Sequence, residues 1–213
     1  MNQFTPEHIE TLEQIILARR DVRGNRFIDS SIPKEHLDKI LFAGVNAPSV
    51  GFSQPWEFVV IKDLKIRNKI KESFFDENEK AKQLFNEKKA DAYTQLKLEG
   101  IIESDINIAV FYKPSEHPVL GQTTMKEAGI YSVVCAIQNM WLMARALHIG
   151  LGWVSILNPD KVKRILNAPD NRQLVGYLCL GHVDKFYKNP ELERLQWEKR
   201  KNINDVIIKE SYS

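Results

Sequence analysis

The chain has 213 residues, of which 43% are hydrophobic, and this composition excludes a disordered tail or a miniprotein held together by disulfides. Thirty Lys and Arg residues against 28 Asp and Glu residues leave a net charge of +2, too small for a dedicated nucleic-acid-binding protein. Any recognition of an anionic ligand must therefore come from local clusters of charge.

The first part of the chain predicts two helices and a strand. Thr5 and Pro6 are typical of a helix start, and apolar residues then recur at helical spacing toward Arg19. A second helix is expected from Pro33 to the residue before Asn46. The aromatic and β-branched run Trp56–Ile61 predicts the first core strand.

The remainder predicts a mixture of strands and helices within one domain, residues 1–213. Residues 65–98 are rich in Lys, Glu, Asp and Gln, which indicates a helical lid, and the charged, poorly periodic residues 187–213 indicate a C-terminal tail. We expect strands at 106–112, 151–157 and 174–180, a long buried helix at 128–144 and a short helix at 159–166. Such mixing favours an α/β or α+β sheet protein.

Several classes of protein lose support. The longest uncharged run, residues 128–144, is shorter than the ~20 residues of a membrane span, and the N-terminus lacks the pattern of a secretory signal, so we expect a cytoplasmic protein without membrane association. The histidines are scattered and no metal site is expected. Cys135 and Cys179 are interpreted as buried free thiols, with a single disulfide between them as the alternative.

A cationic segment, Arg19-Arg20-Asp21-Val22-Arg23, lies where the first helix is expected to end. Cations at this position complement the helix dipole, which is explanation enough for a structural role. In a functional role, the guanidinium groups converge on a phosphate, and Asp21 stays ionised between them.

Two further segments have similar pairs of interpretations. Residues 47–56, with the sequence APSVGFSQPW, form either a simple turn or a loop that offers hydroxyl, amide and backbone donors to a heterocycle. In Gly152-Trp153-Val154-Ser155-Ile156, the hydroxyl of Ser155 is either a satisfied core group or a catalytic one.

Taken together, these segments resemble the FMN-binding nitroreductase superfamily over nearly the whole chain. The resemblance continues through residues 96–101 (LKLEGI), 131–139 (YSVVCAIQN) and 177–182 (YLCLGH). It implies an α+β nitroreductase-like fold, with a central mixed sheet flanked by helices. It also implies an intertwined homodimer that binds FMN between subunits, with residues 128–144 at the interface and residues 187–213 wrapping the partner.

Within the superfamily, the sequence motifs most closely resemble those of the branch that consumes its flavin. The implied reaction is the oxygen-dependent fragmentation of reduced FMN to 5,6-dimethylbenzimidazole, the lower ligand of cobalamin, and erythrose 4-phosphate. A separate flavin reductase would supply reduced FMN, and O2 is the co-substrate. Ordinary nitroreductases carry a small hydroxyl residue where Asp21 stands. A carboxylate there is a competent general base for a proton on the ribityl carbon beside the ring.

The resemblance also assigns site residues. Asp21 and Ser155 are the catalytic candidates, Ser155 by a hydrogen bond near the reactive edge of the flavin, and residues 65–98 would cover the flavin as a lid. The FMN-binding candidates are Arg19, Arg20, Asp21, Val22, Arg23, Ser49, Leu98, Ser155 and Arg200.

Three residues depart from the superfamily pattern, namely Ser53, Gln122 and Gly129. They affect the lid and the substrate side rather than the flavin cradle. Two alternatives remain: an FMN-dependent NAD(P)H nitroreductase or reductive dehalogenase that recycles its flavin, and a flavin-binding protein without turnover. Asp21 argues against the first, and the three departures leave the second open.

Overall fold

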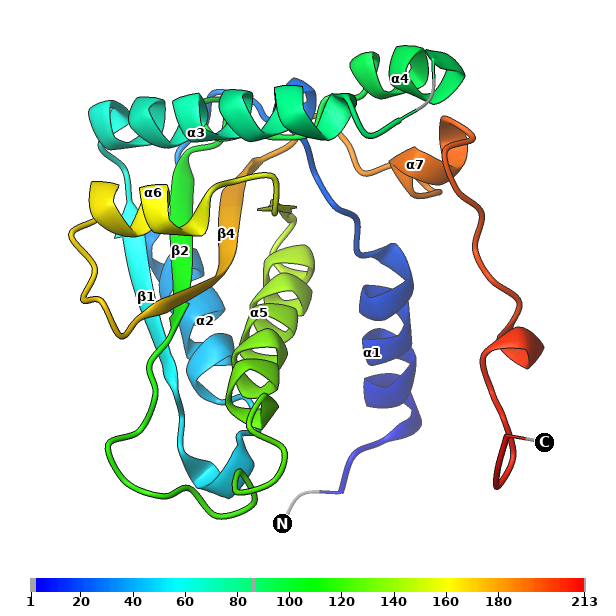
Figure 1. The fold of residues 1–213 in the computed structure, drawn as a ribbon. Helices are drawn as coiled ribbons and strands as arrows, with labels where there is room; N and C mark the ends of the chain where they lie inside the picture. Colours follow the sequence, from blue (N-terminus) through cyan, green and yellow to red (C-terminus); the bar gives the residue numbers. More distant parts are fainter. Residues whose placement is uncertain (1–2, 86, 213) are drawn as a thin grey trace.

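Four strands form one antiparallel sheet in the computed structural model, which describes residues 3–85 and 87–212 (Figure 1). The strands are β1 (Trp56–Ile61), β2 (Ile106–Tyr112), β3 (Ile149–Val154) and β4 (Gln173–His182), in the order β1-β2-β4-β3. β2 and β4 lie in the centre, where the pairing Ile108 with Leu178 sets the register, whereas β1 and β3 are the edges.

The α+β class expected from the sequence is confirmed, but its mixed sheet is corrected. All three strand pairs are antiparallel, and the parallel pairing in the described chain is an isolated bridge between Asp21 and Leu151. The reason is that long helical connections allow either direction for the next strand, so element order did not fix it. The expected strand at 151–157 also begins and ends earlier, at Ile149 and Val154.

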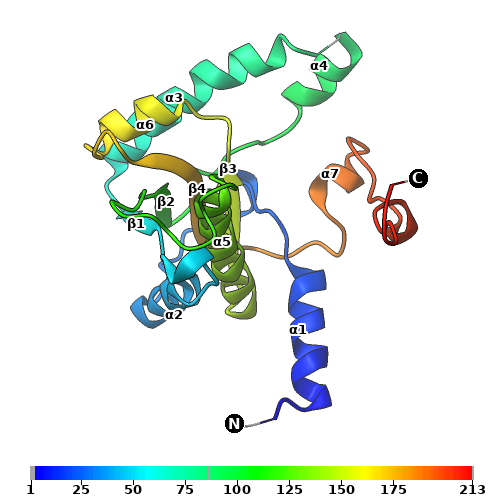
Figure 2. The same ribbon diagram turned by 60° about the horizontal axis from the view of Figure 1, so that its bottom comes forward.

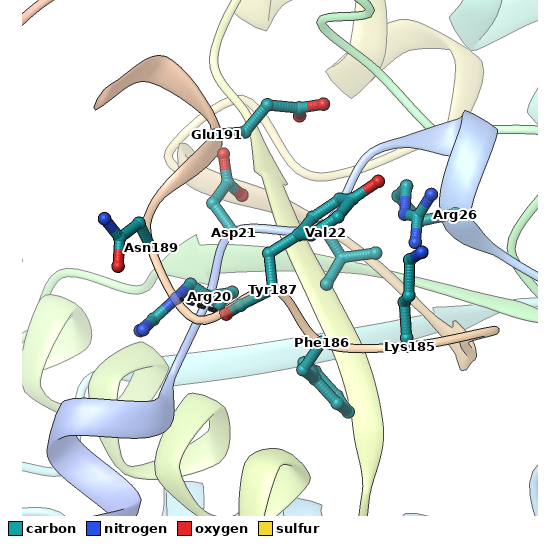
Figure 3. Close-up of a pocket in the computed structure, with 9 residues that line it drawn as sticks. All are labelled: Arg20, Asp21, Val22, Arg26, Lys185, Phe186, Tyr187, Asn189 and Glu191. Atoms are coloured by element: carbon teal, nitrogen blue, oxygen red, sulfur yellow. Dashed lines mark hydrogen bonds between the residues drawn. The ribbon is translucent and has the colours of Figure 1, made fainter. Parts of the chain in front are cut away.

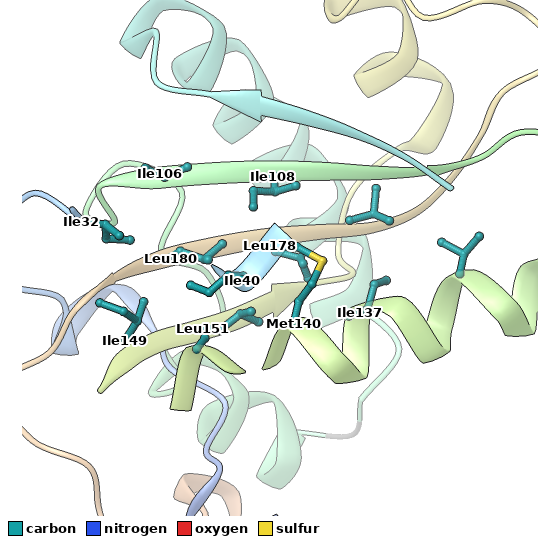
Figure 4. Close-up of a cluster of buried hydrophobic side chains, with 13 residues drawn as sticks. Ile32, Ile40, Ile106, Ile108, Ile137, Met140, Ile149, Leu151, Leu178 and Leu180 are labelled. Atoms are coloured by element: carbon teal, nitrogen blue, oxygen red, sulfur yellow. The ribbon is translucent and has the colours of Figure 1, made fainter. Parts of the chain in front are cut away.

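Helices α2 (Lys34–Val45) and α5 (Ala128–Ala146) cover one face of the sheet. The predicted apolar spacing of both is confirmed, since Ile40 on α2 and Ile137 and Met140 on α5 are fully buried. Figure 4 shows them packed against side chains of the strands, which include Ile108, Leu151 and Leu178. This cluster is the main hydrophobic core.

Helices α3 (Leu64–Lys82) and α6 (Pro159–Ile165) pack on the opposite face. Ile70 and Phe74 on α3 are buried in a second core cluster with Phe111 and Tyr177. The first part of the predicted 65–98 lid is therefore a layer of the core. The following short helix α4 (Glu87–Thr94) and residues 95–98 remain as the candidate lid.

Helix α1 (Pro6–Ala18) and the C-terminal tail lie beside this core (Figure 2). Thr5 caps α1 as predicted, its backbone N–H donating to His8 Nδ1 at 3.2 Å, and α1 has no buried residue. The tail carries the short helix α7 (Glu191–Arg194). Short 3-10 helices also occur at Gly24–Arg26, Val50–Phe52 and Ile203–Asp205.

One cysteine prediction is wrong and one is right. Both thiols are free, so the alternative of a disulfide is excluded, and Cys179 is buried, but Cys135 is exposed. Cys135 lies on α5, which is apolar around its circumference yet packs against the core along one side. Among the described residues, no helix combines the length and apolar character that a bilayer crossing requires.

Candidate active site

The cationic segment leaves α1 in an extended conformation and lies against the edge strand β3. Val22 N donates to Leu151 O at 3.1 Å, and the Val22 side chain is buried. A Cβ at Gly152 would stand 2.0 Å from Val22 O, so a side chain there is incompatible with this approach. The glycine in the Gly-Trp-Val-Ser motif therefore lets the segment behave as an extra strand.

This arrangement fixes the carboxylate of Asp21. Trp153 N donates to Asp21 Oδ1 at 3.1 Å, and Arg23 forms an ion pair with Oδ2. Burial raises the pKa of Asp21 above its ordinary value, although Arg23, the Trp153 N–H and Arg19 oppose this effect. Because its side chain is 34% exposed, Asp21 remains accessible to a ligand.

Arg23 joins three parts of the chain. Besides its ion pair with Asp21, its Nη1 donates to Leu98 O at 3.1 Å and to Trp153 O at 3.2 Å. Its side chain is 16% exposed. Arg23 thus positions Asp21 and Leu98 as well as offering positive charge.

Arg20 holds the C-terminal tail against the cationic segment. Its Nε donates to Tyr187 O at 3.0 Å, and its Nη2 donates to Lys188 O. Burial and then the like charges of Arg19, Arg200 and Arg145 lower its pKa from the ordinary value. The surroundings of Arg20 are therefore strongly positive, as an anion-binding site requires.

A cavity of about 330 Å³ opens beside these residues. Six of the nine predicted site residues line it, namely Arg19, Arg20, Asp21, Arg23, Leu98 and Arg200. Its volume lies in the range of small-molecule and cofactor sites. The structure therefore brings these six residues to one cavity, although α1, residues 96–98 and the tail that form it are far apart in the chain.

A second, much smaller cavity of about 20 Å³ lies on the other side of Asp21 (Figure 3). Val22, a seventh predicted residue, lines it, together with Arg20 and Asp21. Two residues that the sequence interpretation did not single out also have a place here: Lys97 lines the large cavity, and Glu191 lines both. Glu191 lay in the poorly periodic tail, where no pattern marked it.

Ser49 lies at the other end of α5. Its Oγ accepts from Gln54 N at 3.1 Å, and the adjacent Val50 N donates to Ser132 Oγ. The cationic segment is anchored to α5 at Trp141, whose Nε1 donates to Arg20 O at 3.1 Å. Nine helical residues separate Ser132 from Trp141, or about 13 Å. A single chain therefore does not bring Ser49 to the large cavity.

Ser155 is placed differently from the prediction. It was interpreted as a residue within an apolar strand, but β3 ends at Val154 and Ser155 is exposed. The apolar run continues beyond the strand because Leu157 turns back into the second core cluster. Ser155 lines neither of the two cavities beside Asp21.

The three residues that depart from the superfamily pattern lie near the end of α5 where Ser49 is found. Gln122 Nε2 donates to Tyr112 Oη at 3.0 Å, and a Cβ at Gly129 would stand 2.6 Å from the Tyr112 ring and 2.7 Å from Gln122 Nε2. Glycine at 129 therefore accommodates the Gln122–Tyr112 pair. Ser53 and Gln122 line an open cavity of about 410 Å³, and the buried Ser53 Oγ has no hydrogen-bond partner among the described residues.

The geometry supports acid–base chemistry next to an anion site. Asp21 is a carboxylate of raised proton affinity in a cavity rich in arginine. In the described part of the chain, no group of three or more His, Cys, Asp or Glu side chains is arranged to hold a metal ion.

Comparisons with known proteins find relatives of similar sequence and similar fold. The chain is 42% identical over 200 residues to 5,6-dimethylbenzimidazole synthase of Rhodospirillum rubrum, covering 93% of this chain and 94% of the relative. Its fold is similar to that of a BluB-like flavoprotein from Clostridium difficile 630, with a TM-score of 0.71, 22% identity and coverage of 92% and 97% of the two chains.

A third likeness is to oxidized iodotyrosine deiodinase bound to FMN and 3-iodo-L-tyrosine. Here the TM-score is 0.73 with 19% identity, and the match covers 95% of this chain and 100% of the other. The two structural likenesses concern the fold. The model of the nitroreductase family matches residues 16–182, which include the cationic segment, the sheet and α5. The chain belongs to the nitroreductase family.

Proposed function

We propose that the chain catalyses the oxygen-dependent fragmentation of reduced FMN to 5,6-dimethylbenzimidazole and erythrose 4-phosphate. The observation that carries this proposal is Asp21, a carboxylate held by Arg23 and by Trp153 N within a cavity rich in arginine. The relative named 5,6-dimethylbenzimidazole synthase, which matches almost the full length of the chain, supports this reaction over the alternatives in which flavin is recycled or merely bound.

The residues of the large cavity fit FMN. Five cations line it against two carboxylates, an excess that suits a phosphate. Its apolar lining suits a flat ring system and consists of Ile16, Leu17, Leu96, Leu98, Pro190 and Leu192. We assign the phosphate and the ribityl hydroxyls to Arg19, Arg23 and Arg200, with Arg20 and Leu98 beside them. The buried Val22 next to Asp21 helps to hold the segment in place.

The mechanism assigns the proton-transfer step to Asp21. Reduced FMN supplies the ring from which the product is made and the electrons that reduce O2. Asp21 accepts the proton from the ribityl carbon next to that ring, and the raised pKa of its carboxyl makes it a stronger base. Arg23 keeps the Asp21 carboxylate in place during this transfer.

A second copy of the chain completes the proposed site. Ser132, which contacts the loop of Ser49, and Trp141, which contacts the cationic segment, are about 13 Å apart along α5, and Ser155 is exposed outside the cavity. In a homodimer with FMN between subunits, the partner would present Ser49 to the flavin, and Ser155 would face the ring edge. Residues 87–98 act as the lid, residues 187–213 wrap the partner, and a separate flavin reductase supplies reduced FMN.

The test is to incubate purified protein with chemically reduced FMN in air and to follow products by chromatography and mass spectrometry. We expect 5,6-dimethylbenzimidazole from the wild-type protein. Asp21→Asn should bind FMN with unchanged affinity and lose at least about 100-fold in product formation, because general-base catalysis is removed. The exposed Asp38→Asn is the matched control and should retain activity.

Two outcomes would contradict the proposal. If FMN is reoxidised intact while NAD(P)H and a nitroarene are consumed, the chain is a reductase that recycles its flavin. If FMN binds tightly and neither reaction occurs, the chain sequesters flavin.

Unchanged product formation by Asp21→Asn would remove Asp21 from the catalytic role.

A further inference from the structure

A second carboxylate stands beside Asp21. Glu191, from α7, lines both the large cavity and the small one, and Asp21 is the other acid that does so. In Figure 3 the Glu191 side chain begins close to Asp21 and extends away from it, along the lining of the same pocket. The small cavity, at about 20 Å³, has room for about one water molecule.

Cation–π contacts hold α7 in this position. The guanidinium of Arg194 lies 3.7 Å from the centroid of the Tyr187 ring, and that of Arg26 lies 4.4 Å from it. Arg20 donates from the cationic segment to the backbone oxygens of Tyr187 and Lys188. Glu191 is therefore fixed relative to Asp21 by contacts on both sides of the tail.

The charges that face Asp21 come from four parts of the chain. Its own segment supplies Arg19, Arg20 and Arg23. Lys97 and Arg200 line the large cavity with it, and Arg26 and Lys185 line the small cavity with the phenol of Tyr187. Among the described residues that line the two cavities, Glu191 is the one acid besides Asp21. Burial is the largest cause that raises the pKa of Asp21, and the negative charge of Glu191 adds to it.

We propose that Glu191 is a positioning residue for the reaction assigned to Asp21: its carboxylate lines the same two cavities as Asp21, and its negative charge makes Asp21 a stronger base. This inference rests on the proposed function. In the step concerned, the C–H bond at the ribityl carbon breaks, its electron pair stays with the carbon fragment, and the proton forms an O–H bond with Asp21. Repulsion between two neighbouring carboxylates favours that protonated state.

A direct test needs no turnover. The carboxyl carbon of Asp21 is followed by NMR during a pH titration of the flavin-free protein with labelled aspartate, and Asp21→Asn identifies its signal. In Glu191→Gln the midpoint should move to lower pH, because the repulsion is gone. Glu193→Gln makes the same charge change on the same helix but lines neither cavity, so it should leave the midpoint unchanged.

The pH profile of product formation gives a second readout. In Glu191→Gln the acid limb should move to lower pH and the plateau rate should fall roughly threefold to tenfold, as expected for a weaker base. Glu191→Asp keeps the negative charge and should restore most of the plateau rate and of the position of the acid limb. An unchanged titration midpoint, or an equal shift in Glu193→Gln, would overturn the role of Glu191. Absence of product from the wild-type protein would instead overturn the proposed function. The NMR titration would still decide whether Glu191 raises the pKa of Asp21.

Discussion

At the scale of single residues, Asp21 is subject to opposing influences. Burial raises its pKa, whereas the Arg23 ion pair and the Trp153 N–H lower it, and the net effect is a pKa above the ordinary value of 3.8. Folding therefore disfavours the ionised form that the proposed reaction uses. Ionisable groups that cost stability in this way are typical of functional sites.

This cost predicts a pH-dependent effect of Asp21→Asn. Because the pKa is higher in the folded protein than in the unfolded chain, the contribution of Asp21 to stability falls as the pH rises through the folded value. Asparagine should thus increase the free energy of unfolding at pH 7 by on the order of 1 kcal/mol or less, since part of the side chain faces solvent. Below the ordinary value of 3.8 the gain should vanish.

Urea denaturation at pH 7 and at about pH 3.5 measures this difference. The exposed Asp38→Asn, which loses its ion pair with Lys34, is the control and should show no gain at pH 7. A destabilised Asp21→Asn at pH 7 would mean that the Arg23 ion pair outweighs burial.

The residues of the large cavity could be predicted because they form short, unusual runs. Arg19-Arg20-Asp21-Val22-Arg23 combines like charges with an acid at the end of a helix, and that pattern is visible without a structure. Glu191 could not be found in this way, since its role depends on a tail that folds back through Tyr187 contacts. The position of Ser155 was missed because the apolar run extends past the end of β3.

At the scale of elements, periodicity identified the helices and strands but not how they pair. The apolar spacing of α2 and α5 directly reflects the core that they cover, so it predicted both. Strand direction depends on long connections and was therefore not fixed by the pattern. Helix α3 was misleading in a different way: it is polar on average, yet a narrow apolar stripe buries Ile70 and Phe74.

Two neighbouring phenylalanines test whether α3 is a core layer. Phe74 is 5% exposed and Phe75 is 54% exposed. Phe74→Ala should lower the free energy of unfolding by about 3 kcal/mol, because it leaves a cavity in the second core cluster. Phe75→Ala should lower it by less than about 1 kcal/mol. Equal losses in urea denaturation would show that α3 does not pack through this stripe.

At the scale of the whole molecule, a large apolar surface is left uncovered. On α1, Leu12 is 52% exposed and Leu17 is 73% exposed, and the tail exposes Val206, Ile207 and Ile208. Tyr131 on α5 is 55% exposed. Exposed apolar side chains on several parts of one chain are typical of an interface between subunits. This surface supports the homodimer proposed above.

A charge placed on α1 tests the homodimer. Leu12→Glu should give a species of half the wild-type mass in light scattering and weaken FMN binding more than tenfold, because each site would lose the residues that the partner contributes. Leu12 lines neither cavity beside Asp21, so a direct contact with FMN does not explain that loss.

Phe75→Glu is the matched control, since Phe75 is as exposed as Leu12 but lies on α3. It should keep both the wild-type mass and the FMN affinity. A Leu12→Glu protein that is monomeric yet binds FMN normally would show that one chain holds the flavin alone, and the role proposed for Ser49 of a second copy would then fail. A wild-type protein that is already monomeric would contradict the homodimer itself, and the exposed apolar residues of α1 and the tail would need another partner.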